Sequence, residues 1–106
     1  MREISVKELA AALASPTPPV LVDVRNPDEH AYANIGGSTL IPLYEIEERA
    51  HELDAHRGKH LVVFCHLGVR SLSGAAYLES LGHDASSLAG GIEAWSCEID
   101  PRVRRY

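Results

Sequence analysis

The segment from Cys65 to Ser71 holds the residue types that nucleophilic sulfur chemistry needs. A cysteine thiolate is a strong nucleophile, and Gly68 lets the backbone curl so that several N–H groups point at one anion. The planar guanidinium of Arg70 matches an oxyanion such as a sulfonate or a phosphate. We therefore expect Cys65 to be the catalytic nucleophile and the six residues after it to bind an anionic substrate: His66, Leu67, Gly68, Val69, Arg70 and Ser71.

Three of these side chains also allow a second interpretation. Arg70 can instead tie the loop to the rest of the fold through carboxylates. His66 either contacts the substrate, tunes the thiolate or simply fills an exposed loop. Ser71 either caps the following helix or donates a hydrogen bond to the sulfur.

The reactive loop is expected to follow a buried strand and to precede a helix. Apolar runs rich in β-branched residues at 20–24 and 61–64 predict strands buried on both faces, which is typical of a parallel sheet. A helix predicted over about residues 71–81 would turn its free N–H groups and positive dipole end toward Cys65 and stabilise a thiolate. In such sheets ligands bind beyond the carboxyl ends of the strands, and Cys65 lies at one of these ends.

The remaining elements continue an alternation of strands and helices. Ser5 and Glu8 form a capping-box signal for a helix over about residues 5–14. We also predict a helix from Asn26-Pro27, strands at 39–41 and 86–88, a helix over 43–53 and a last helix that carries Ile92, Trp95 and Ile99. The pattern predicts one α/β domain over residues 1–106, with a mainly parallel central sheet and helices on both faces.

Two charged residues at the end of the first buried strand are expected to support the site. Asp23 stands at the strand end, where its carboxylate can hold neighbouring loop N–H groups. Arg25 is expected to pair with Glu29. Both roles are structural rather than catalytic.

Three segments together resemble the rhodanese homology domain. They are Leu21-Val22-Asp23-Val24-Arg25 with Glu29, then Cys65-x-x-Gly68-x-Arg70-Ser71, and then Leu88-Ala89-Gly90-Gly91-Ile92-x-x-Trp95. The resemblance covers nearly the whole chain in the expected order. It implies a parallel α/β fold and a thiosulfate sulfurtransferase-like activity without a cofactor. In that activity a persulfide on Cys65 carries sulfane sulfur from a small anionic donor such as thiosulfate to a thiophilic acceptor.

Loop length separates this chemistry from a related one on the same fold. Cysteine phosphatases and arsenate reductases have a longer loop between cysteine and arginine than the four residues found here. The shorter loop resembles that of the sulfur-handling branch. Two alternatives remain: a non-catalytic module that presents a persulfide or binds a partner, and a cysteine phosphatase or arsenate reductase.

The segment from Trp95 to Tyr106 resembles the end of rhodanese modules joined to adenylyltransferases. This implies a sulfur-carrier protein or its adenylyltransferase as a possible partner. Cys97 is expected to be a small buried hydrophobe rather than a thiol that resolves the persulfide. The arginines at positions 102, 104 and 105 are expected to form a solvated tail.

Composition excludes several other function classes. The chain has 106 residues, of which 45% are hydrophobic and 24% charged, which is typical of a globular domain. Its net charge of −5 argues against nucleic-acid binding as the main task. No apolar run has the length of a membrane span and the first residues lack a signal-peptide core, so we expect a cytoplasmic protein without membrane contact. The scattered histidines have no cysteines paired with them, so no metal site is expected.

Overall fold

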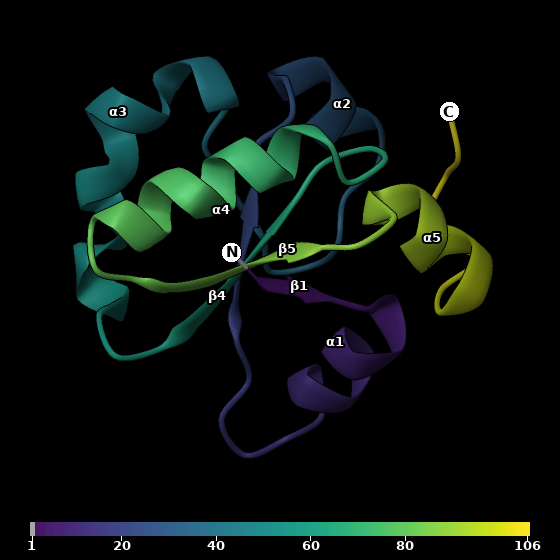
Figure 1. The fold of residues 1–106 in the computed structure, drawn as a ribbon. Helices are drawn as coiled ribbons and strands as arrows, with labels where there is room; N and C mark the ends of the chain where they lie inside the picture. Colours follow the sequence, from purple (N-terminus) through teal and green to yellow (C-terminus); the bar gives the residue numbers. More distant parts are fainter. Residues whose placement is uncertain (1) are drawn as a thin grey trace.

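The computed structural model describes residues 2–106, which form a five-stranded parallel sheet (Figure 1). The strands are β1 (Arg2–Ile4), β2 (Val20–Asp23), β3 (Thr39–Leu40), β4 (His60–Phe64) and β5 (Asp84–Leu88). They lie side by side in the order β1-β5-β4-β2-β3, and every neighbouring pair is parallel. The predicted α/β class with a parallel central sheet is confirmed.

Helices cover both faces of the sheet, as predicted (Figure 1). One face carries α3 (Ile46–Arg49) and α4 (Arg70–Ser80), and the other carries α1 (Val6–Leu13) and α5 (Gly91–Glu98). The alternating side chains of β4 serve both sides, since Val63 packs in the α4 layer while Val62 packs in the α1 and α5 layer. The central strand is therefore buried on both faces, which explains its continuous apolar run.

Local signals place the starts of two helices correctly. The Ser5 hydroxyl accepts a hydrogen bond from the Glu8 N–H, and the Glu8 carboxylate accepts one from the Ser5 N–H. Helix α2 (Pro27–Tyr32) begins with proline at its first position, and the Glu29 carboxylate accepts a hydrogen bond from the Asn26 N–H. These bonds use N–H groups that a helix start leaves free.

Two elements differ from the prediction. The continuous helix expected over residues 43–53 is divided into η1 (Leu43–Glu45), α3 and η2 (Ala50–His56), the first and last of which are 3₁₀ turns. The apolar spacing is kept through this change of winding, because Ile46, Ala50 and Leu53 are all buried. Strand β1 was not predicted, since its three residues lack an apolar run and lie at the sheet edge.

Candidate active site

The sulfur of Cys65 lies directly beyond β4, inside the loop that leads into α4. Its Sγ accepts hydrogen bonds from the backbone N–H of Gly68 at 3.2 Å and of Ser71 at 3.4 Å. The Ser71 hydroxyl lies 3.4 Å from the same sulfur. Gly68 takes the conformation that the loop requires, with φ of +97°. The loop therefore directs two backbone N–H donors at the sulfur and places one hydroxyl beside it, and N–H groups aimed at a sulfur stabilise negative charge on it.

The start of α5 holds the loop in place through backbone hydrogen bonds. The N–H groups of Ile92 and Glu93 donate to the carbonyl oxygens of Cys65 and His66, at 2.9 and 3.1 Å. This contact needs a glycine at position 91, because a Cβ there would lie 2.4 Å from the His66 oxygen. Sequence reasoning noted the two consecutive glycines but did not identify this bracing role.

Arg70 is paired with a carboxylate at a partly buried position. Its Nη1 and Nη2 donate to the two oxygens of Glu29, at 2.8 and 2.9 Å. Mainly because of this pairing, the pKa of Glu29 is lowered to about 2. The geometry corresponds to the second interpretation of Arg70, in which the arginine ties the loop to its surroundings.

The expected pairing of Arg25 with Glu29 is wrong, because Arg25 pairs with Asp23 instead. The Nε and Nη2 of Arg25 donate to the two Asp23 oxygens at 2.9 and 2.8 Å, and neither side chain is exposed. Asp23 also accepts from the backbone N–H of Arg25, as expected of an aspartate at a strand end. The fork of Arg25 reaches the nearest carboxylate, which leaves Glu29 free to hold Arg70.

The C-terminal residue reaches the loop and contacts both pairs. The Tyr106 hydroxyl donates to Glu29 at 2.7 Å and accepts from Arg25 at 2.8 Å. Its ring stacks on the ring of His66, with centroids 3.9 Å apart. The expectation of a solvated tail concerned Arg102, Arg104 and Arg105, which are exposed, whereas Tyr106 beside them contacts the loop. Its contacts join residues far apart in the sequence, which no local pattern reveals.

Comparison with known proteins agrees with the parallel α/β fold. The family model described as Rhodanese-like domain matches residues 5–98. The chain belongs to the rhodanese-like family. It is 44% identical, over 72% of its length and 69% of the relative's, to the thiosulfate sulfurtransferase GlpE of Pseudomonas fluorescens. It is 30% identical to the putative sulfurtransferase YtwF of Bacillus subtilis, over 96% of this chain and 97% of that one. Transfer of sulfur is the activity that the names of these relatives share.

The fold comparison agrees with the sequence comparison. A rhodanese-related protein from Thermoplasma volcanium superposes with a TM-score of 0.86 at 30% identity, and the match covers 100% of both chains. In other relatives this rhodanese-like domain is one part of a longer chain. It spans 38% of the rhodanese-like/PpiC domain-containing protein 12 of Arabidopsis thaliana and 26% of the probable adenylyltransferase/sulfurtransferase MoeZ of Mycobacterium tuberculosis.

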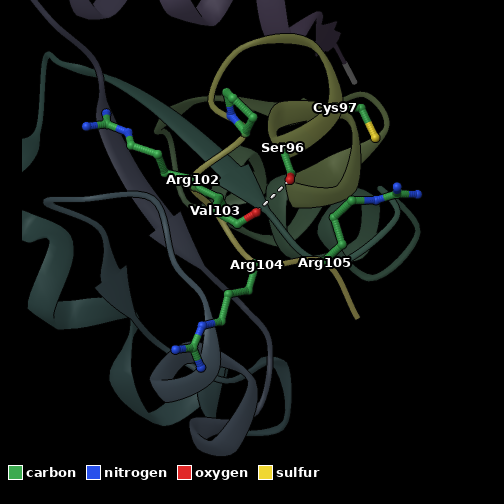
Figure 2. A pocket seen from close by; sticks show the side chains of 7 residues that line it. Ser96, Cys97, Arg102, Val103, Arg104 and Arg105 are labelled. Atoms are coloured by element: carbon green, nitrogen blue, oxygen red, sulfur yellow. Dashed lines mark hydrogen bonds between the residues drawn. The ribbon is translucent and has the colours of Figure 1, made fainter.

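A pocket of this rhodanese-like domain that no residue of the loop lines lies beside Cys97 (Figure 2). The pocket has a volume of about 510 Å³ and lies between the end of α5 and the tail, where the Ser96 hydroxyl donates to the Val103 carbonyl. Cys97 is exposed, so its expected burial is wrong. The three arginines at the pocket point apart (Figure 2), and each has a partner: Asp100 for Arg102, the Tyr32 ring for Arg104, and Glu93 for Arg105.

The predicted site residues in the loop of this rhodanese-like domain lie together, but they fall into two groups that differ in exposure to solvent. Gly68 and Ser71 face the sulfur, whereas Leu67 and Val69 are exposed on the outer side of the loop. Among residues 2–106, no helix is long and apolar enough to span a membrane, and no group of three His, Cys, Asp or Glu side chains is placed to hold a metal ion.

Proposed function

We propose that this domain moves sulfane sulfur from thiosulfate, or from a persulfide, to a thiophilic acceptor through a persulfide on Cys65. One observation carries the proposal: the Cys65 sulfur accepts N–H hydrogen bonds from Gly68 and Ser71 and lies beside the Ser71 hydroxyl. Hydrogen-bond donors aimed at a sulfur stabilise both the thiolate and the negative outer sulfur of a persulfide. The names of the relatives support the reaction class.

The transfer takes two displacements at sulfur. The Cys65 thiolate attacks the outer sulfur of thiosulfate; the S–S bond breaks, and its electron pair leaves with sulfite. Cys65 is then a persulfide with a negatively charged outer sulfur. An acceptor such as cyanide or a thiolate attacks that outer sulfur, and the second S–S bond breaks with its electron pair returning to Cys65. Thiocyanate or an acceptor persulfide leaves, and the thiolate is restored without an external oxidant or reductant.

The surroundings of the loop favour a donor that does not need a free guanidinium. Arg70 is paired with Glu29, so its guanidinium is not free to bind the sulfonate group of thiosulfate. Leu67 and Val69, which are 58% and 71% exposed, present apolar surface at the outside of the loop. We expect thiosulfate to react with a high KM and an apolar persulfide to react at lower concentration.

The same apolar surface supports a protein acceptor as a second candidate. Leu67, Val69 and the aromatic pair Tyr32 and Tyr106 are exposed on or beside the loop. Relatives that contain this domain include proteins named adenylyltransferase and sulfurtransferase. A carrier with an adenylated carboxyl terminus would be attacked by the outer persulfide sulfur with loss of AMP. A thiol would then cleave the acyl disulfide to a thiocarboxylate and a mixed disulfide on Cys65.

Mass spectrometry and kinetics test the proposal together. Purified protein treated with thiosulfate should gain one sulfur on Cys65, and cyanide should remove it as thiocyanate. Cys65→Ser should lose both reactions, whereas the matched variant Cys97→Ser should keep them. Folded Cys65→Ser protein with undiminished sulfur transfer contradicts the proposal. Turnover of an aryl phosphate without sulfur loading supports the phosphatase alternative. Sulfur loading without turnover supports a module that only presents the persulfide.

A further inference from the structure

A second serine lies behind the one that faces the sulfur. The Ser71 Oγ is 2.7 Å from the Ser87 Oγ of β5, and both residues are completely buried. Cys65, Ser71 and Ser87 thus form a hydrogen-bonded row from the sulfur into the sheet. Within the described residues 2–106, Ser71 is the only hydrogen-bond partner of the Ser87 hydroxyl.

The direction of the hydrogen bonds in this row depends on the charge of the sulfur. When Cys65 is a thiol, its S–H donates to Ser71, and Ser71 donates to Ser87. The Ser87 proton is then buried without an acceptor, which costs free energy. When Cys65 is a thiolate or a persulfide anion, Ser87 donates to Ser71 and Ser71 donates to the sulfur. Every proton then has an acceptor, and donation by Ser87 strengthens donation by Ser71.

We propose that Ser87 is a positioning residue, whose hydroxyl turns the Ser71 hydroxyl toward the sulfur and so favours the anionic form of Cys65. The inference rests on the proposed function, since it concerns the same sulfur. The hydroxyl groups in this row only change their orientation, and no proton passes from one residue to the next. The thiol proton is lost to solvent base when the thiolate forms.

The neighbouring residue on the strand provides a matched control. Ser86 is also a buried serine of β5, but successive side chains of a strand point to opposite faces. Its hydroxyl lies 2.8 Å from His60 Nε2 and not in the row. Ser86→Ala therefore removes a buried hydroxyl from the same strand without touching the site.

The charged and titratable groups next to the row are the same in all variants. In the parent protein Arg70 is paired with Glu29 and His66 is stacked on Tyr106, and none of these four residues is substituted in the variants. A difference between variants at Ser87 therefore reports the hydroxyl and not a changed charge.

The test is the rate of alkylation of Cys65 by iodoacetamide across pH, in a Cys97→Ser background so that one thiol reacts. Ser87→Ala should move the midpoint of the profile upward by about half a unit, which is about a threefold slower reaction below the midpoint. Ser86→Ala should leave the midpoint in place. Ser87→Thr and Ser87→Val have nearly the same shape but differ in the hydroxyl, so the first should resemble the parent and the second Ser87→Ala.

Other results overturn the inference. Each of three results would do so. They are an unchanged profile in Ser87→Ala, a shift in Ser86→Ala equal to the shift in Ser87→Ala, and equal profiles for Ser87→Thr and Ser87→Val. These outcomes can be distinguished from a failure of the proposed function. If Cys65→Ser kept sulfur transfer while the alkylation profiles shifted as expected, the proposed route through a Cys65 persulfide would fail and the role of Ser87 would stand.

Discussion

Arg70 and Glu29 meet through two parallel hydrogen bonds and tie the first turn of α4 to the first turn of α2. These turns follow β4 and β2, which are adjacent in the sheet. The pair therefore fixes the end of the reactive loop against a neighbouring loop. A bidentate pair of this kind has a more fixed geometry than a single surface contact.

Arg70→Ala should lower the free energy of unfolding and weaken sulfur loading together. We expect a loss of about 1–2 kcal/mol, since hydrogen bonds to charged groups are discounted here for the partial exposure of Arg70. Chemical denaturation and the loading assay measure the two effects. Arg105→Ala breaks the more exposed pair with Glu93 and serves as the control. A stable Arg70→Ala protein whose KM for thiosulfate alone is raised would restore the substrate-binding interpretation.

Lowering the pH should lower the free energy of unfolding of the domain as the Glu29 carboxylate becomes protonated. Its folded pKa of about 2 lies below the ordinary value, mainly because Arg70 donates to it, so the folded state favours the carboxylate. The stabilisation is complete above the ordinary pKa near 4.5 and is lost as pH falls from there through about 2. Glu29→Gln should flatten the fall of melting temperature over this range. Parallel pH profiles for the two proteins would contradict the assignment.

Asp23→Ala should be among the most destabilising single substitutions in the chain. It leaves Arg25 buried without its carboxylate, which we expect to cost about 3–5 kcal/mol. Asp100→Ala is matched to it, since Asp100 also pairs with an arginine two residues later, but Arg102 is 89% exposed. Its cost should stay within about 1 kcal/mol. Similar losses in the two variants would show that burial does not govern these pairs.

Gly91→Ala should damage the reactive loop from a distance in sequence. The added Cβ would lie 2.4 Å from the His66 oxygen and 2.6 Å from the Cys65 oxygen, at a φ of +59°. The loop must move, so sulfur loading should fall by about tenfold or more, because a small misplacement of reacting groups slows a reaction strongly. The melting temperature should fall with it. Gly36→Ala meets no atom within 4 Å and should change neither measurement. Full loading in Gly91→Ala would show that the loop tolerates displacement from α5.

Much of this architecture could be predicted from the sequence. The apolar runs of β2 and β4 and the capping signals of α1 and α2 are local, and local patterns report periodicity and helix ends well. The division of residues 43–56 into α-helical and 3₁₀ turns could not be predicted in the same way. Both windings bury Ile46, Ala50 and Leu53, and only packing selects between them.

Partner choice within the site was harder to predict than the identity of its residues. Cys65, Gly68 and Ser71 are recognisable because their types and spacing are tied to one loop. Among Asp23, Arg25, Glu29 and Arg70, the choice of which carboxylate pairs with which arginine depends on which side chains come together beyond the carboxyl ends of β2 and β4. Ser87 carries no sequence signal at all, since a serine in a strand is ordinary until its hydroxyl is seen against Ser71.

The stacking of Tyr106 on His66 places the last residue of the described chain beside the reactive loop. Anything joined to that residue would start next to the loop that holds Cys65. A short flexible tether there would hold an attached thiol or peptide near Cys65 at an effective concentration on the order of millimolar. The carboxyl end of this domain is therefore a natural attachment point for a covalently delivered acceptor, and an unsuitable one for an affinity tag.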